Sequence, residues 1–384
     1  MEEFDSAKSY LEYYLAKELT TLGNGVCVFT FGLSKEKSRI MSTEGFEVIN
    51  IPHFVTIQGY HVPNLQGLAY ILRFIKAKEP DVIHCQPLDS PLSLILFAFK
   101  SFYNYKIVGT IMTQLNLVFS PWGLKKKILF SMSKIVVDTF VAKRTEAVIA
   151  KTGELARVLS RSYRVPEKKF RIIPLGSDPE IFKFSSEERY RLRKKLGFSD
   201  TDVVLVYSGK LDSTKGLDVF LKAFALISIN NDGVKLLIIG KGDAKFTEYL
   251  KQLVSDLGVG NKVVFQSWVE KTLIPSFYSA SDIGVWPGLS SISIVDAAST
   301  GLPLVISRCP VETFAIENEN GFSFEIGNVQ ELRRYLEILI RDDGLRKRMG
   351  QKSRQLVEQT LNWSSITGKY LTAYTSTLSG LQTK

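Results

Sequence analysis

The sequence predicts an α/β protein made of two doubly wound, Rossmann-like domains that face a cleft. The chain has 384 residues, of which 45% are hydrophobic and 23% charged, so it is long enough for two domains with large cores. Short apolar segments alternate with segments of helical spacing, and this series begins twice along the chain. Continuous apolar strands that alternate with helices are typical of parallel sheets covered by helices.

The first series begins with a helix, predicted over 11–22 from its spacing of apolar residues. The elements expected after it are strands at 26–31 and 46–51, a helix at 65–78, and strands at 81–85, 105–111, 147–150 and 170–174. A doubly wound domain usually begins with a strand that lies centrally in its sheet, and losing it removes several buried side chains at about 1.5–3 kcal/mol each. We therefore expect the first domain to lack its first strand and the natural start to lie upstream of Met1.

The second series follows the Pro- and Gly-containing linker 174–184. Its expected strands are 203–208, 235–240, 263–265, 283–287 and 304–307. Three helices are expected between them: one at 217–229, a second that ends near 257, and a third that starts near 293. The predicted domains are therefore 1–178 and 179–362, with a terminal segment 363–384. Ligands of open α/β sheets bind at the carboxyl ends of the strands, so we expect the site in the cleft.

Composition narrows the classes of protein. Three widely spaced cysteines argue against a disulfide scaffold, and three histidines are too few for a His-rich metal site. Asp200 and Asp202 form a DxD pattern, but they precede a strand and are interpreted as a turn. No secretory signal is visible, and polar residues and a proline interrupt the longest uncharged run, 107–124. We expect a cytoplasmic protein without a metal.

Much of the net charge of +10 lies between residues 100 and 144, a stretch that contains eight basic residues and one acidic residue. Trp122 and the lysines Lys125, Lys126 and Lys127 favour an anionic membrane surface as the partner, on the inner face of the membrane. Nucleic acid attracts the same charges, but no nucleic-acid motif accompanies them, so we expect no nucleic-acid partner. A solvated basic helix is the remaining interpretation.

A loop with two lysines follows the strand at 203–208. Gly209 allows close backbone approach, and Lys210 and Lys215 lie one loop apart, so their ammonium groups can hold a diphosphate from two sides. No glycine precedes Gly209-Lys210 at the spacing of a Walker A loop. The loop is also compatible with plain surface exposure of both lysines.

A polar turn follows the strand at 283–287. Ser291, Ile292 and Ser293 begin a helix there, and free amides at a helix N-terminus bind phosphate oxygens. Asp296, about one turn into the helix, can accept hydrogen bonds from ribose hydroxyls. Simple N-capping by the serines is the alternative.

Taken in order, these segments resemble the retaining family-4 glycosyltransferases of the GT-B fold, also described as glycosyl transferases group 1. The resemblance runs from about residue 7 and is carried by EAVIAKT (146–152), RIIPLGSD (171–178), GK (209–210), KG (215–216), SDIGVWP (281–287) and DAASTGLP (296–303). MG at 349–350 and NW at 362–363 resemble the tail of that family, whose last helix returns to the first domain.

The resemblance implies an enzyme that moves a hexose from a UDP- or GDP-sugar to a hydroxyl of a glycan or lipid-linked acceptor, with retention and without a metal. The first domain would bind the acceptor and the second the nucleotide-sugar. Lys210 and Lys215 match the cations that hold the donor diphosphate. The turn 291–293 matches the one that offers amides to the phosphate and sugar, and Asp296 matches the ribose-binding carboxylate.

Two positions depart from the family pattern. Gly288 stands where the family has the first glutamate of a pair, and Met112 stands where it has a histidine, with Thr113 and Gln114 nearest. The resemblance therefore assigns no catalytic residue, although these positions would line the sugar and acceptor side. A nucleotide-sugar 2-epimerase, and a non-catalytic nucleotide-sugar-binding or partner protein of the same fold, remain the alternatives.

Overall fold

The computed structural model describes residues 10–31, 38–57, 60–88, 90–111, 134–135, 137–229, 231–289, 291–308 and 319–379. The chain divides into two compact units. Unit 1 comprises residues 1–174 and 366–384, and unit 2 comprises residues 175–365. Both contain parallel sheets with helices, so the predicted α/β class is confirmed.

Unit 2 contains one six-stranded sheet in the order β12-β11-β10-β13-β14-β15, and every pair in it is parallel. Its strands are β10 (Val203–Ser208), β11 (Val234–Ile239), β12 (Val263–Gln266), β13 (Ile283–Trp286), β14 (Leu304–Ser307) and β15 (Gly321–Phe324). The sequence predicts the first five of these to within one or two residues, because buried parallel strands are continuous apolar runs.

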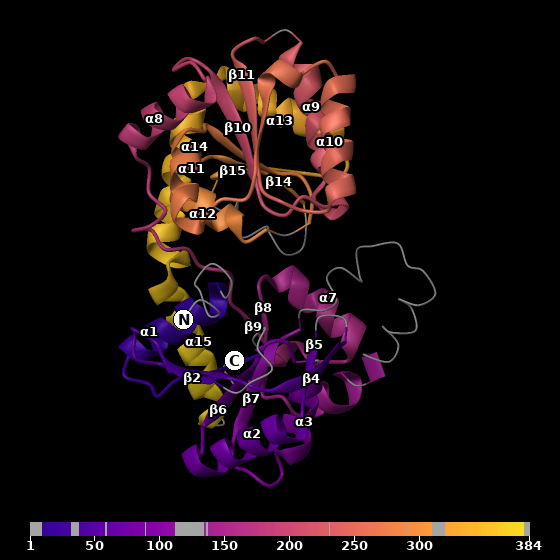
Figure 1. Ribbon diagram of the computed structural model, residues 1–384, viewed down its shortest axis with the longest axis vertical. Coiled ribbons are helices and arrows are strands. Elements are labelled where there is room, and N and C mark those ends of the chain that lie inside the picture. Colours follow the sequence, from indigo (N-terminus) through magenta and orange to yellow (C-terminus); the bar gives the residue numbers. More distant parts are fainter. Residues whose placement is uncertain are drawn as a thin grey trace. The chain divides into compact units, whose positions relative to one another are not determined.

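Helices cover both faces of this sheet (Figure 1). They are α8 (Ser186–Leu196), α9 (Leu217–Ser228), α10 (Ala244–Asp256), α11 (Ile274–Ser279), α12 (Ser293–Ser299), α13 (Val329–Arg341) and α14 (Asp343–Leu356), with short turns η3 (Ser213–Lys215), η4 (Gly260–Lys262), η5 (Lys271–Leu273) and η7 (Val357–Leu361). α9 contacts α10 and α13, whereas α12 contacts α11 and α14. Sandwiched in this way, β13 and β14 are buried at every residue.

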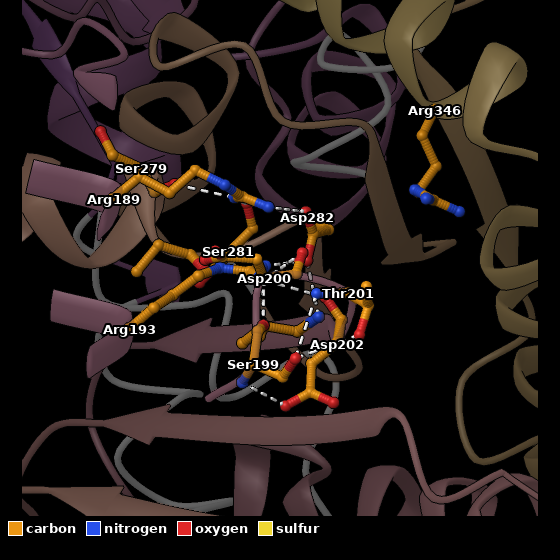
Figure 2. Close-up of polar contacts among 12 residues, drawn as sticks. Arg189, Arg193, Ser199, Asp200, Thr201, Asp202, Ser279, Ser281, Asp282 and Arg346 are labelled. Atoms are coloured by element: carbon orange, nitrogen blue, oxygen red, sulfur yellow. Dashed lines mark hydrogen bonds and ion pairs between the residues drawn. The ribbon is translucent and has the colours of Figure 1, made fainter. Parts of the chain in front are cut away.

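A buried ion pair fastens α8 to the amino ends of β10 and β13 (Figure 2). The Arg193 guanidinium is 1% exposed and donates to Asp282 Oδ2 at 2.6 Å and to the carbonyls of Ala280 and Ser199. Arg189 donates to the other oxygen of Asp282 at 2.7 Å. Removing one partner of such a pair leaves a buried charge and typically costs about 3–5 kcal/mol.

The DxD segment lies at this same end. The Asp202 carboxylate accepts the backbone N–H of Ser199 at 2.8 Å, and the carbonyls of Asp200 and Asp202 accept from Arg193. Asp202 is only 9% exposed, so the turn is packed against the ion pair rather than solvated. These acids therefore stabilise a turn at the amino ends of the strands.

Unit 1 has its strands in three sheets. A parallel sheet has the order β6-β7-β8-β9, a second has the order β1-β3-β2 with β2 antiparallel to β3, and β4 and β5 form an antiparallel hairpin. The strands are β1 (Cys27–Thr30), β2 (Ser38–Met41), β3 (Glu47–Asn50), β4 (His53–Ile57), β5 (Tyr60–Pro63), β6 (Val82–Cys85), β7 (Lys106–Thr110), β8 (Ala147–Ala150) and β9 (Phe170–Ile172).

The helices of unit 1 are α1 (Tyr10–Thr21), α2 (Leu65–Lys78), α3 (Pro91–Phe99), α6 (Ala142–Arg144), α7 (Gly153–Tyr163) and, apart from its first turn, α15 (Trp363–Leu378), with short turns η1 (Val137–Val141) and η2 (Glu167–Lys169). Within the described ranges, no strand pairs with β1 other than β3, or with β6 other than β7. All four residues of β1 are only half-buried.

α15 packs on unit 1 through aromatic side chains. The Tyr374 hydroxyl and His84 Nδ1 of β6 share a hydrogen bond of 2.6 Å, and the rings of Tyr370 and His84 lie 5.6 Å apart between centroids. Burial lowers the pKa of His84 to about 4, so the imidazole is neutral near pH 7.

Among the helices of the described ranges, none has the length and apolar character needed to span a membrane.

Candidate functional site

The two predicted donor-binding segments meet at the carboxyl ends of β10 and β13. Gly209, which follows β10, has a φ of +150°, a conformation that favours glycine. A side-chain carbon at Gly209 would lie 3.3 Å from the Ser291 hydroxyl and 2.9 Å from the Tyr207 hydroxyl. The turn with Lys210 therefore lies directly beside the turn that begins α12.

Glycines also bring the second half of the lysine loop against the end of β13. A Cβ at Gly288 would come within 2.3 Å of the Lys215 carbonyl carbon, so a side chain there requires the backbone to move. The Leu289 N–H donates to the Thr214 carbonyl at 2.9 Å across the same contact. Gly216 has a φ of +64°, and a Cβ there would lie 2.7 Å from the Pro287 carbonyl oxygen. Two loops far apart in sequence are thus joined through glycine.

The two lysines flank one carboxylate. The Lys210 side chain is 70% exposed, and its Nζ lies 3.5 Å from Asp212 Oδ2. Burial opposes ionisation of Asp212, but hydrogen bonds from Thr214 and the charges of Lys215 and Lys210 outweigh it and lower the pKa of that carboxyl. Lys215 Nζ donates to the Leu289 carbonyl at 2.9 Å. Both ammonium groups therefore lie around the same loop.

A hydrogen-bond network beneath these turns was not predicted from the sequence. The Ser208 carbonyl accepts from the Ser293 hydroxyl at 2.7 Å and from Trp286 Nε1 at 3.0 Å. The Tyr278 hydroxyl bonds Ser208 Oγ at 2.6 Å, and the Tyr207 hydroxyl donates to the Lys210 carbonyl at 2.9 Å. The only sequence signal is that β10 and β13 end in polar or aromatic residues. This network fixes the positions of Lys210 and Ser293.

α12 begins at Ser293, and Ile292 precedes it without a side-chain cap. In α12 the N–H groups of Ile294 and Val295 make only long hydrogen bonds of 3.4 Å, to the carbonyls of Ser291 and Ile292. The start of a helix carries a partial positive charge, so this end suits an anion. Ser293 does not cap the helix, because its hydroxyl donates to Ser208 instead. The structure therefore differs from the alternative in which the serines serve simply as N-caps.

Asp296 lies on α12 and is 6% exposed. Its Oδ1 accepts from the Ser177 hydroxyl at 2.6 Å, which ties α12 to the segment 175–178. From the sequence, Asp296 is predicted to accept hydrogen bonds from ribose hydroxyls. In the structure its carboxylate already accepts a hydrogen bond from Ser177, so a ribose hydroxyl would share the carboxylate with Ser177.

Several predicted residues lie outside the described residues. These are Met112, Thr113 and Gln114 on the acceptor side and Trp122, Lys125, Lys126 and Lys127 of the basic stretch. Of the described cations in that stretch, Lys100 pairs with Glu146 at 2.5 Å and Lys134 with Asp138 at 3.0 Å. A membrane contact by this stretch would therefore depend on cations other than these two.

The described site suits an anionic ligand with two binding elements. Ammonium groups and helix amides favour a phosphate-bearing ligand, and a carboxylate one turn along the helix accepts hydroxyl hydrogen bonds. Glycine contacts and buried hydroxyls hold these elements in place, which limits the reorganisation needed on binding.

Comparison with known proteins identifies two matching family models that together span most of the chain. Residues 12–181 match the model described as Glycosyltransferase Family 4, and residues 188–356 match Glycosyl transferases group 1. The first match covers most of residues 1–174, which belong to unit 1. The second match lies in unit 2 and includes the lysine loop, Gly288 and Asp296.

The chain is also similar over most of its length to individual proteins and to solved structures. An uncharacterised glycosyltransferase of Methanocaldococcus jannaschii is 25% identical over 370 residues, 94% of this chain and 92% of the relative. Alpha-monoglucosyldiacylglycerol synthase of Streptococcus pneumoniae is 25% identical over 305 residues, 77% of this chain and 66% of the relative. The crystal structure of Anabaena HepE in complex with UDP has a TM-score of 0.77 at 17% identity, covering 98% of both chains.

Proposed function

The chain belongs to the glycosyltransferases of family 4 and group 1, and from that premise we propose that it transfers a hexose from a UDP-sugar to an acceptor hydroxyl with retention. One observation carries the proposal. Lys210 and Lys215 lie around the loop that glycines hold against the start of α12, the helix that bears Asp296. UDP is favoured because the similar HepE structure is named as a complex with UDP.

In this proposal the lysines stabilise the leaving group. The bond between the anomeric carbon and the β-phosphate oxygen breaks, and negative charge grows on that phosphate. Ammonium groups and helix amides that are already in position stabilise this charge more in the transition state than before it. They neutralise the diphosphate without a metal, so transfer is expected to persist in EDTA.

Retention follows if the acceptor approaches the face that the phosphate leaves. The acceptor oxygen bonds to the anomeric carbon, and its proton passes to the departing phosphate oxygen, which releases UDP. This route needs no glutamate at Gly288. The structure leaves no room for one there, since even a Cβ would meet the Lys215 backbone.

The acceptor is proposed to be a glycan or a lipid-linked hydroxyl at an anionic membrane surface. Two features support a lipid: the basic stretch around Lys125, and the similarity to alpha-monoglucosyldiacylglycerol synthase. An acceptor panel therefore includes a neutral sugar, a cyclitol, and diacylglycerol in anionic vesicles.

The donor part is tested by calorimetry with UDP. Lys210→Ala combined with Lys215→Ala removes two charge-assisted contacts, so the affinity for UDP is expected to fall at least about 100-fold. Lys222→Ala with Lys251→Ala removes the same charge from helices α9 and α10 and is expected to leave the affinity unchanged. Equal affinity in all three proteins would contradict the site. UDP binding without transfer to any acceptor would favour the non-catalytic alternative.

A further inference from the structure

A pocket in unit 1 is built from residues that the donor site does not use. It lies between β9 and α15, and its volume is about 190 Å³. Within the described ranges β9 pairs only with β8, so it is an edge strand of its sheet. The wall combines cations, hydroxyls and apolar groups: Arg171 and Ile172 of β9, and Lys369, Thr372, Ala373 and Ser376 of α15. We call this the β9–α15 pocket.

The size of the pocket limits its ligand to a small molecule. A dry cavity of about 150 Å³ holds benzene, whereas sites for drug-sized ligands measure about 300–1,000 Å³. At about 190 Å³ the β9–α15 pocket is therefore too small for a nucleoside diphosphate and suits a molecule of about ten non-hydrogen atoms.

The two cations of the pocket take part in no ion pair within the described part of the chain. The ion pairs of unit 1 use other basic residues: Arg39, Lys100, Lys134 and Arg164. Arg171 Nη1 donates to the carbonyls of Lys168 at 2.7 Å and Phe170 at 3.1 Å, and these bonds orient the guanidinium without neutralising it. Lys369 is exposed. The wall therefore carries two positive charges that suit an anion.

Two cations on one wall favour a doubly charged group. A phosphomonoester carries a charge of about −1.5 to −2 near pH 7, whereas a carboxylate carries a single charge. A planar guanidinium can donate to two phosphate oxygens at once, and an ammonium adds a compact charge beside it. Arg171 and Lys369 together therefore favour a phosphate over a carboxylate.

The rest of the wall indicates what the phosphate is attached to. The Thr372 hydroxyl donates to the Gly368 carbonyl at 2.9 Å. The Ser376 hydroxyl donates to the Ala373 carbonyl, also at 2.9 Å. A hydroxyl that donates in this way can still accept a hydrogen bond, so both can receive the hydroxyl of a ligand. Ile172 is 47% exposed and offers an apolar contact. The wall thus suits a short, hydroxyl-bearing carbon chain joined to a phosphate.

Both walls of the pocket are close in sequence to the points where the chain passes from one unit to the other. Unit 1 ends at Pro174, two residues after β9, and resumes at Ile366 within α15. On the unit 2 side the same two segments are already joined, because the Ser177 N–H donates to the Leu361 carbonyl at 2.8 Å. A ligand bound to Arg171 would join the two segments on the unit 1 side as well.

We propose that the β9–α15 pocket binds a small phosphomonoester, with its phosphate between Arg171 and Lys369, and that the ligand fastens α15 to β9. This proposal goes beyond the proposed function and uses no residue of the lysine loop. The same phosphate group occurs in soluble compounds such as glycerol 3-phosphate and in the headgroup of phosphatidic acid, so both sources are tested.

Calorimetry with glycerol 3-phosphate tests the soluble source. Arg171→Ala combined with Lys369→Ala removes both charges, and the affinity is expected to fall at least about tenfold. Lys369→Ala alone, at an exposed position whose loss does not threaten folding, is expected to cost about threefold. Thr372→Val keeps the shape but removes a hydrogen-bond acceptor and is expected to cost about as much. The matched control, Arg73→Ala with Lys76→Ala on the exposed face of α2, is expected to change nothing.

Co-sedimentation with phosphatidylcholine vesicles that contain phosphatidic acid tests the lipid source. Glycerol 3-phosphate binding that is lost in the Arg171, Lys369 double variant supports a soluble ligand, and vesicle binding alone that is lost in it supports a lipid headgroup. Failure of the wild-type protein to bind either probe, or equal binding in the double variant, would overturn the site. Loss of glycerol 3-phosphate binding in Lys210→Ala with Lys215→Ala would overturn it too, because the phosphate would then occupy the lysine loop.

Hydrogen exchange tests whether the ligand fastens α15. The ligand must leave before α15 can separate from β9, so at about 100 times its Kd the amides of residues 369–376 are expected to exchange up to about 100-fold more slowly. The amides of α10 in unit 2 serve as the reference. Unchanged exchange in residues 369–376 at saturation would contradict the fastening of α15.

Discussion

Units 1 and 2 share the same alternation of strands and helices, but their strands are joined into sheets to different extents. In unit 2 six parallel strands form one sheet, and β13 and β14 are buried at every residue. In unit 1 the strands are divided among separate sheets, and β1 is half-buried throughout. A continuous sheet buries both faces of its central strands, whereas a divided sheet leaves apolar edges partly exposed.

The two units also differ in how their buried polar groups are hydrogen-bonded. The buried Arg193 of unit 2 donates to a carboxylate and to several carbonyls. In unit 1, His53 Nδ1, His84 Nε2 and the Thr110 hydroxyl are buried without a hydrogen-bond partner within the described ranges. Unmet buried polar groups weaken a core, so the comparison predicts that the core of unit 1 is less stable than that of unit 2.

Breaking the ion pair of unit 2 should produce the largest effect. Asp282→Ala leaves Arg193 buried without its carboxylate and is expected to lower the free energy of unfolding by about 3–5 kcal/mol. The corresponding change in unit 1, Glu146→Ala, removes partners of Lys100 and of the Ile107 N–H at a partly exposed site, and should cost about 1–3 kcal/mol. Urea unfolding followed by circular dichroism measures both. Equal losses would remove the contrast between the units.

Acid should weaken unit 1 through His84. The pKa of His84 is about 4 in the folded chain against 6.5 unfolded, so the unfolded chain binds the proton first. Stability from this group is complete above pH 6.5 and is lost as pH falls toward 4, by at most about 3 kcal/mol.

The control for this prediction is His84→Gln, which keeps a hydrogen-bonding side chain but does not titrate. Urea midpoints between pH 7 and pH 4.5 are expected to fall less steeply in the variant than in the wild-type protein. Glu12 acts in the opposite direction, because burial raises the pKa of its carboxyl in the folded chain. Parallel slopes in the two proteins would show that His84 does not contribute.

The glycine contact of unit 2 should give a smaller loss of stability and a clear loss of binding. Gly288→Ala places a Cβ against the Lys215 backbone and is expected to cost about 1–3 kcal/mol, because the loops must separate. UDP affinity, measured by calorimetry, should fall with it. Gly260→Ala, where nothing lies within 4 Å, is the matched control in the same unit. Gly288→Glu is expected to be no better than Gly288→Ala, and higher activity in Gly288→Glu would contradict this account.

Much of the fold follows from local sequence pattern. The strands at 147–150, 203–208 and 304–307 coincide with β8, β10 and β14, and the helix at 65–78 coincides with α2. Burial on both faces requires continuous apolar residues, and that requirement is visible within a few positions. The hairpin at 53–63 was not predicted, because its histidines and proline interrupt the apolar pattern.

The sequence by itself determined the two α/β series, the family resemblance and the residue types of the donor loop, because these depend on near neighbours along the chain. Only the tertiary structure decided which residues meet: Asp296 with Ser177, and Gly288 with the backbone of Lys215. It also decided that His53 and His61 share one face with Phe31. Such contacts depend on strand order and on how closely two backbones approach, and neither leaves a periodic trace in the sequence.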